Sequence, residues 1–192
     1  MSLDLTDPHR RALFLAAAAT ITGGLVARAT AAGAAPTGTG ASGDFNFLAG
    51  NWKIRHRRLK TGGASPTWDE FDGEATCWTV LGGAGSIEEL RIPARDFSGL
   101  GIRLLDPATR LWADYWVNGK ERVIGAPGLT GAFRDGAGIF EAEDVEGPTP
   151  VKARAVWDRI TPSSCRWHQS TSRDGGKTWE ENWNMVWTRV GP

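Results

Sequence analysis

Hydrophobic and polar residues alternate with a period of two along most of the chain after residue 44. Within residues 51–59, Trp52, Ile54 and His56 fall on one face of an extended segment and basic residues fall on the other. No stretch repeats apolar residues at i, i+3, i+4 and i+7 over three turns, as an amphipathic helix would. The pattern therefore predicts an all-β protein.

Ten short strands are expected, separated by turns rich in Gly, Pro and Asp. They are predicted at residues 51–59, 70–80, 86–92, 99–105, 111–118, 130–134, 138–145, 151–157, 164–171 and 179–190. Antiparallel strands in sequence order leave two unpaired edges unless the sheet closes, so we expect a single antiparallel up-and-down β-barrel over residues 44–190. A sandwich of two sheets would show the same alternation and is the alternative.

The N-terminal segment differs in composition from the rest of the chain. Arg10 and Arg11 precede an apolar, Ala-rich stretch at residues 12–27, which is too short to span a bilayer and is followed by small residues. Residues 1–31 are therefore predicted to be a cleavable export signal resembling the twin-arginine type, with the general secretory route and an uncleaved anchor as alternatives. Residues 32–43 are expected to be a flexible linker. The predicted location is periplasmic or extracellular.

Charge argues against a polyanion as partner. The chain has 22 basic and 22 acidic residues, so no net field attracts nucleic acid or an anionic membrane. With 25 Gly and 10 Trp it has many turn residues and many large flat side chains, which suits short strands. No membrane span is expected after processing, and the sequence does not indicate an oligomeric state.

The entry to the first strand carries a Gly-x-Trp motif, Gly50-Asn51-Trp52, preceded by Phe-x-Phe-Leu. It resembles the opening of the lipocalins and their calycin relatives, in which a basic residue near the end of the last strand packs over the tryptophan. The resemblance assigns that role to Arg189. With the segment 106–117, Trp167-x-Gln169 and the segment 174–180, the chain is also similar to a large bacterial family of unassigned function. That resemblance covers about residues 44–190 and implies a lipocalin-like barrel.

The segment 172–179 fits the Asp-box pattern Ser-x-Asp-x-Gly-x-Thr-Trp, which also occurs in sialidases. The motif is structural there, because the carboxylate caps a hairpin turn, glycine supplies a positive φ and the tryptophan packs beneath. A sialidase would need several copies and a longer chain. We therefore expect a plain hairpin, with Asp174, Gly176 and Trp179 as structural residues.

Residues suited to catalysis or metal binding are scarce. Beyond the predicted signal only His56 and His168 remain, and neither lies in a metal-ligand spacing, so no metal site and no cofactor is predicted. His56 is expected to face the barrel interior, where it is a general base, a haem ligand, a hydrogen-bond partner of a bound ligand or a hydrogen-bonded core residue. Glu88 and Glu89 are adjacent and face opposite ways, so at most one enters the barrel.

The tryptophans are too numerous to be explained by packing at one end of the barrel alone. Some should line a cavity for a flat or apolar ligand. The candidate ligand-binding residues are His56, Glu89, Arg103, Tyr115, Trp116, Gln169 and Trp183.

Cys77 and Cys165 form either a disulfide, as exported chains often contain, or two buried thiols in apolar runs.

Two functions fit these residues, and a structural or assembly role in the cell envelope, with a filled barrel and no ligand, is a third alternative. The first is an exported lipocalin-like protein that binds a small apolar or aromatic molecule in the barrel. The second is a small barrel enzyme, such as a cyclase, isomerase or hydrolase, with His56 or a Glu as acid or base and with Arg103 or Tyr115 stabilising negative charge.

Overall fold

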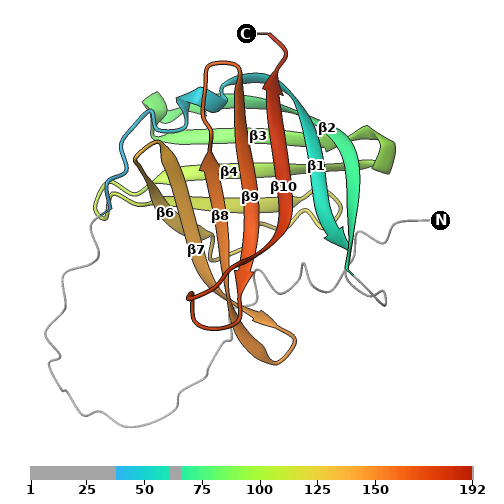
Figure 1. The fold of residues 1–192 in the computed structure, drawn as a ribbon. Coiled ribbons are helices and arrows are strands. Elements are labelled where there is room, and N and C mark those ends of the chain that lie inside the picture. Colours follow the sequence, from blue (N-terminus) through green and yellow to red (C-terminus); the bar gives the residue numbers. More distant parts are fainter. Residues whose placement is uncertain (1–37, 61–65, 192) are drawn as a thin grey trace, which may run out of the picture.

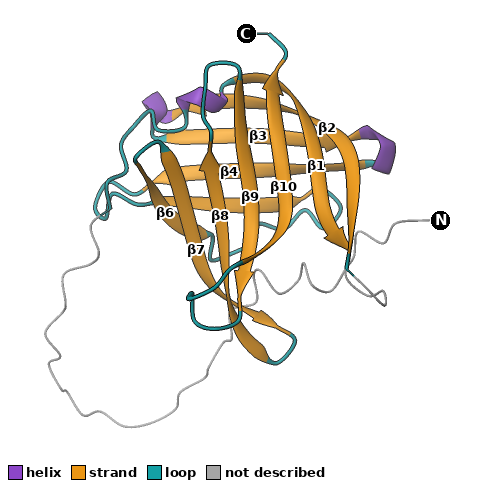
Figure 2. Cartoon of the chain, viewed as in Figure 1, coloured by secondary structure: helices purple, strands orange, loops and turns teal. Residues whose placement is uncertain are grey.

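The computed structural model describes residues 38–60 and 66–191 and is a closed β-barrel of ten antiparallel strands (Figure 1). The predicted export signal at residues 1–31 and the first part of the predicted linker lie outside the described residues. Short 3-10 helices are the only helical elements in the described ranges, and strands make up most of the rest (Figure 2). The predicted all-β barrel is thus confirmed and the sandwich alternative is wrong.

Each strand pairs with its neighbours in the sequence, and the first strand closes the barrel on the last. The strands are β1 (Gly50–Lys60), β2 (Thr67–Val80), β3 (Gly85–Ile92), β4 (Phe97–Leu105), β5 (Trp112–Asn118), β6 (Leu129–Arg134), β7 (Ala137–Glu146), β8 (Thr149–Asp158), β9 (Ser164–Ser172) and β10 (Glu180–Arg189). The helices are η3 (Asn46–Leu48), η4 (Leu81–Gly83) and η5 (Pro93–Arg95). All ten predicted strands are present. In Figure 1 the steep strands β6–β10 stand in front of the nearly horizontal β3 and β4.

Alternation along the strands places every second side chain inside the barrel. Trp52, Ile54 and His56 of β1 are buried, as predicted, and the basic side chains between them point outward. The inward side chains of the other strands join them in one hydrophobic core, to which indole and phenyl rings contribute most of the volume.

One end of the barrel is closed where β1 begins and β10 ends. Gly50 adopts a φ of 123°, which favours glycine, and Trp52 Nε1 donates a 2.7 Å hydrogen bond to the Leu48 carbonyl of η3. The Arg189 guanidinium lies 4.2 Å from the Trp52 ring centroid. It also donates to the carbonyls of Phe47, Ala49 and Pro162. The predicted packing of Arg189 over Trp52 is present.

Residues 38–43 do not behave as a free linker. The backbone amides of Gly38 and Gly40 donate to the carbonyls of Thr109 and Arg110 at 2.6 and 2.9 Å. Thr39 Oγ1 donates to the Phe133 carbonyl. The folded domain therefore begins before the expected boundary at residue 44.

The hairpin between β9 and β10 has the geometry expected of an Asp-box. Asp174 Oδ1 accepts from the amides of Lys177 and Thr178, and Oδ2 accepts from the Thr178 hydroxyl at 2.6 Å. Gly176 has a φ of 95°, and Trp179 Nε1 donates to its carbonyl. These contacts close the turn.

Both cysteines are free and buried in the core. They face the interior from β2 and β9, which are separated by β1 and β10. Burial raises the pKa of the Cys165 thiol to about 12 and raises that of Cys77 as well, so neither is a reactive thiolate.

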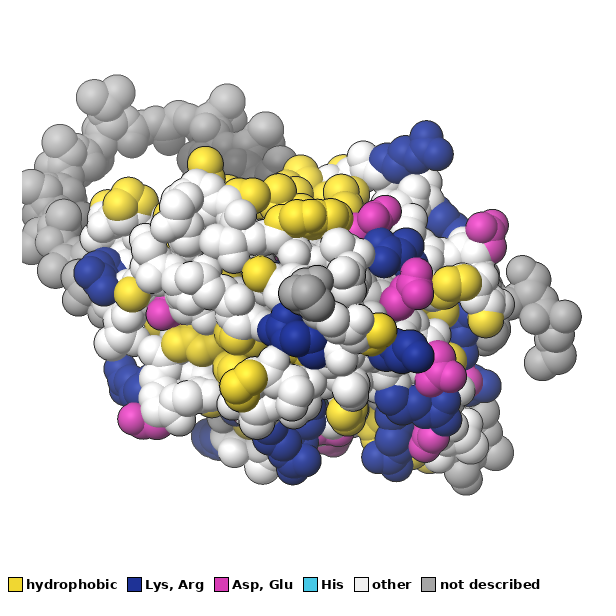
Figure 3. Space-filling view, turned by 90° about the horizontal axis from the view of Figure 1, so that it is seen from above, with side chains coloured by type: hydrophobic (Ala, Val, Ile, Leu, Met, Phe, Trp, Pro, Cys, Tyr) yellow, Lys and Arg dark blue, Asp and Glu magenta, His cyan; other side chains and the backbone are white. Residues whose placement is uncertain are grey.

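The outer surface is charged on one side and apolar on another (Figure 3). Charged side chains gather over β1 and β2, where Arg55 bonds both Glu70 and Asp72, and Arg91 of β3 bonds Glu74. Large hydrophobic side chains are also exposed, at Trp78 of β2, Leu81 of η4, and Leu100 and Leu104 of β4.

Candidate functional site

The barrel contains a cavity of about 400 Å³, and its lining extends to the loop after β5, which the strand register places at the end opposite Trp52. The volume is at the lower end of the roughly 300–1,000 Å³ of small-molecule sites. Leu90, Leu129 and Met185 contribute aliphatic surface, and Ala153 and Ala155 of β8 leave room where larger residues would fill the barrel. The cavity suits a small and mainly apolar ligand.

Five indoles form much of the cavity wall. They are Trp116, Trp157, Trp167, Trp183 and Trp187. The ring centroids of Trp157 and Trp187 are 5.4 Å apart, and those of Trp167 and Trp183 are 5.9 Å apart in an edge-to-face arrangement. Flat rings that hold one another in this way give the wall a defined shape.

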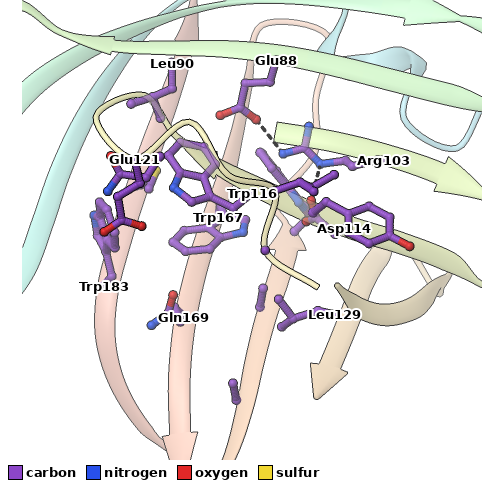
Figure 4. A pocket seen from close by; sticks show the side chains of 18 of the residues that line it. Glu88, Leu90, Arg103, Asp114, Trp116, Glu121, Leu129, Trp167, Gln169 and Trp183 are labelled. Atoms are coloured by element: carbon purple, nitrogen blue, oxygen red, sulfur yellow. Dashed lines mark hydrogen bonds and ion pairs between the residues drawn. The ribbon is translucent and has the colours of Figure 1, made fainter. Parts of the chain in front are cut away.

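A buried charged cluster lies beside these indoles. Arg103 of β4 is 4% exposed, and its Nη2 donates a 2.6 Å hydrogen bond to Glu88 Oε2 of β3. Its Nε lies 3.4 Å from Asp114 Oδ1 of β5. In the view of Figure 4, Arg103 and Asp114 lie to the right of Trp167 and Trp183, Glu88 lies above these two indoles, and dashed lines mark the contacts of Arg103. One cation and two carboxylates thus meet at the cavity wall.

The cluster changes the protonation equilibria of its members. Burial raises the pKa of Asp114 to about 6, and attraction by Arg103 only partly opposes this effect. Burial also opposes the charge on Arg103, but Asp114 and Glu88 outweigh that effect and raise its pKa. Arg103 therefore stays charged, whereas Asp114 changes charge at mildly acidic pH.

The connection between β5 and β6 forms part of the cavity mouth. Glu121, Val123, Ile124 and Gly125 all contact the cavity, and Val123 is 66% exposed. The backbone amide of Gly125 donates a 3.0 Å hydrogen bond to the Trp116 carbonyl and so attaches the loop to β5. A ligand would enter or leave past this loop.

Most of the predicted site residues meet at the cavity. Arg103, Trp116, Gln169 and Trp183 line it. Tyr115 contacts it as well, although the inward positions of β5 are those of Asp114 and Trp116 on either side. Five of the seven candidates therefore contact the cavity, and the other two, Glu89 and His56, do not.

Glu89 is not in the cavity. Its side chain is 44% exposed and pairs with Arg91 on the outer surface, whereas Glu88 is 2% exposed and lines the cavity. The reason is the phase of β3, in which Leu90 and Ile92 face the core and Glu88 shares their face. The two apolar residues were the signal that could have selected Glu88.

His56 is fully buried but does not line the cavity. Its ring stacks on Phe71 with centroids 4.5 Å apart and planes at 9°. Trp183 Nε1 donates to its Nδ1 at 3.3 Å. Gly73 of β2 leaves space for the imidazole, because a Cβ there would lie 2.5 Å from His56 Nε2. The core interpretation of His56 is the one this geometry favours.

Several residues that line the cavity were not among the candidates predicted from the sequence. Glu88, Asp114, Trp157 and Trp187 lie at inward positions that alternation identifies, but alternation does not show which inward residues border a void. The loop 119–128 carried a usable signal, since Val123 and Ile124 form an apolar pair inside a polar, Gly- and Pro-containing turn.

Two kinds of feature are absent from residues 38–60 and 66–191. No group of three or more His, Cys, Asp and Glu side chains there is arranged to hold a metal ion. No helix in these ranges is long and apolar enough to cross a membrane.

Neither a protein-family model nor a curated protein matches the chain.

Proposed function

We propose that the protein is an exported, lipocalin-like binding protein that takes a small apolar or aromatic molecule into the barrel. The observation that carries the proposal is the cavity of about 400 Å³, walled by five indoles and open past the loop 119–128. Aromatic walls with a few fixed polar groups are typical of small-molecule sites. The resemblance of Gly50-x-Trp52 and Arg189 to the lipocalin closure supports the same function.

The enzyme alternative has weaker support from the placement of its residues. His56 is separated from the cavity, so it is not positioned to exchange a proton with a ligand there. Glu88 lines the cavity but is held by Arg103. Asp114, with its raised pKa, is the better-placed carboxyl group, but none of the described residues that line the cavity is a Ser, Thr, Cys, Lys or His that could act as a nucleophile beside it.

Saturation-transfer NMR with naphthalene as a flat apolar probe tests binding in the cavity. Transfer is expected with the wild type. It should be lost in Ala155→Phe, which places a ring in the cavity from β8, and reduced in Ala153→Leu. Ile139→Phe is the matched control, because Ile139 is 47% exposed on the outer face of β7. Equal transfer in Ala155→Phe and the wild type would show that the probe binds elsewhere.

The export part of the proposal is tested by sequencing the N-terminus of the protein from its own cells. We expect a start between residues 32 and 38, because cleavage after Ala31 removes the Arg10-Arg11 segment and because Gly38 is hydrogen-bonded to the barrel. An intact Met1 in the exported fraction would rule out a cleaved signal.

A further inference from the structure

β4 has the reverse of the polarity that is usual for a strand of a barrel in water. Its buried, inward positions are Gly99, Gly101 and Arg103. Its outward positions include Leu100 and Leu104, which are 38% and 40% exposed, with Ile102 between them. An antiparallel sheet with one face in water normally places its polar side chains on that face. The outer surface of β4 therefore has the composition of a surface that another molecule covers.

The neighbouring strands extend this surface on both sides of β4. The register aligns one outward residue from each of four strands in a single row: Trp78, Ile87, Ile102 and Tyr115. Leu100 lies in the next row toward the cavity mouth, and Leu104 lies in the next row toward the closed end. We call these six side chains the outer apolar face.

The side chains at one end of the face pack together on the outside of the barrel. A Cβ at Gly85 of β3 would lie 2.8 Å from Val80 and 3.4 Å from both Leu81 and Leu104. These side chains thus converge over Gly85, yet Leu81 remains 71% exposed and Trp78 is 47% exposed. In Figure 3, hydrophobic side chains gather along the uppermost edge of the view, which corresponds to the rear of Figure 1, where β3 and β4 lie. The surface is continuous and not a set of scattered residues.

Other strands of the barrel carry charged side chains at their outward positions. β1 has Lys53, Arg55 and Arg57, and β8 has Lys152 and Arg154. Single exposed apolar residues such as Ile139 of β7 also occur, but they are normal on protein surfaces. The outer apolar face is therefore a local feature of β2–β5 and not a general property of this barrel.

The size of the face matches the centre of a protein–protein interface. Strands about 4.8 Å apart, with outward residues about 6.8 Å apart along each strand, give three rows on four strands an area of roughly 400 Å². A standard interface buries about 800 Å² on each partner, with an apolar centre and a polar rim. Glu74, Glu89 and Arg91 surround the face on the β2–β3 side, where Arg91 bonds both carboxylates.

The charges favour a second copy of this chain over a membrane as the covering molecule. The chain has 22 basic and 22 acidic residues, so no net charge keeps two copies apart. At the edge of the face, Glu74 and Glu89 outnumber Arg91, whereas attraction to anionic lipid needs a cluster of basic residues. The outer surface of a sheet also packs well on a second sheet, and another copy supplies an identical one.

We infer that the outer apolar face is the contact between two copies of the chain in a two-fold symmetric dimer. The sheets of the two copies pack face to face, and the same residues contribute from both sides. Ile87 and Ile102 lie nearest the two-fold axis, because they occupy the middle of the central row. The inference goes beyond ligand binding and does not depend on it.

Sedimentation velocity over a range of concentrations tests the inference. We expect the wild type to be a dimer at micromolar concentration. The double variant Leu100→Glu, Leu104→Glu places two carboxylates per copy in the apolar contact, and it should weaken the dimer by about 100-fold or more. Ile139→Glu is the matched control, because it makes the same change at an outward residue that is 47% exposed on β7. It should remain a dimer.

Saturation transfer from naphthalene shows whether the double variant is folded. Leu100 and Leu104 do not line the cavity, so transfer should equal that of the wild type.

Cross-linking gives a second measurement that does not depend on weakening the contact. Cys77 and Cys165 are buried, so an introduced surface thiol is the one that reacts. A short bismaleimide should link two copies of Ile102→Cys, because the two sheets of such a contact lie about 10 Å apart. It should not link two copies of Ile139→Cys.

The outcomes that would overturn the inference are distinct. A wild type that stays monomeric over the whole concentration range would exclude the dimer, and its co-sedimentation with anionic phospholipid vesicles would assign the face to a membrane. A dimer that persists in Leu100→Glu, Leu104→Glu would place the contact elsewhere on the barrel. Equal cross-linking of Ile102→Cys and Ile139→Cys would do the same. None of these results bears on naphthalene binding, which tests the proposed function separately.

Discussion

His56 is a histidine of the core in this barrel. It stacks on Phe71, which in turn contacts the Arg95 guanidinium at 3.4 Å on its ring, and it accepts from the indole of Trp183. His56→Phe keeps the ring volume but removes that acceptor. We expect the free energy of unfolding to fall by about 1–3 kcal/mol, with unchanged affinity for naphthalene per folded molecule. Denaturant unfolding and titration of one preparation give both values.

A loss of affinity in His56→Phe at unchanged stability would instead assign His56 to the binding site. Since Trp183 both lines the cavity and donates to His56, the titration should be paired with Trp183→Phe. That variant changes the cavity wall directly and is expected to alter affinity.

Asp114 should make stability depend on pH. Its pKa is raised to about 6 in the folded protein by burial, above the value of about 3.9 in an unfolded chain, so the folded state binds its proton more tightly. The resulting stabilisation is complete below pH 4 and is lost as the pH rises toward 6. Asp114→Asn removes this titration. Its stability relative to the wild type should therefore increase between pH 4 and pH 7, by up to about 3 kcal/mol.

The measurement is the midpoint of urea unfolding for both proteins across that pH range. The difference between the two proteins isolates Asp114, because other titrating groups are common to both. A difference that is constant with pH would show that Asp114 titrates at its ordinary value.

The hairpin between β9 and β10 depends on Asp174, which closes it through both carboxylate oxygens. Asp174→Ala leaves the amides of Lys177 and Thr178 without this acceptor, so we expect a lower melting temperature and unchanged affinity for naphthalene. Asp174→Asn keeps one acceptor oxygen and should fall between the two. A selective loss of affinity at the wild-type melting temperature would show that this loop contributes to binding.

The closed end depends on Arg189 at the end of β10, which bonds three carbonyl oxygens and covers Trp52. Arg189→Met keeps the aliphatic stem but loses these hydrogen bonds. The free energy of unfolding should fall by about 2 kcal/mol or more. Arg189→Lys is the control. It retains the charge but cannot present the planar fork of donors, so it should recover only part of the loss. If Arg189→Met were as stable as the wild type, Arg189 would not be needed to stabilise the closed end of the barrel.

The strands of this fold could be predicted because the signal for each strand lies in consecutive residues of the sequence. The alternation of Trp52, Ile54 and His56 gives the inward face of β1 without any tertiary information, and turn residues mark where strands end. Arg103 and Trp116, two of the candidate ligand-binding residues, do line the cavity. Alternation indicated only that at most one of Glu88 and Glu89 enters the barrel, and Glu89 was chosen because the neighbouring apolar residues Leu90 and Ile92 were not used to set the phase of the strand.

The charged cluster was not predictable from the same pattern. It depends on the register that pairs Arg103 with Asp114 across β4 and β5, and a slip of one residue would turn the strand's side chains to the other face. The void also depends on how far side chains from opposite walls reach. His56 shows the difference, since it faces inward as predicted but is separated from the cavity.

Across the whole molecule, the central claim is that the barrel interior holds a small molecule. Native mass spectrometry of the protein purified from its own cells tests this most directly, with Ala155→Phe and Ile139→Phe prepared in parallel. We predict a non-covalent small-molecule adduct on the wild type and on Ile139→Phe, and none on Ala155→Phe. Wild-type protein without an adduct, or an adduct that Ala155→Phe retains, would contradict the claim.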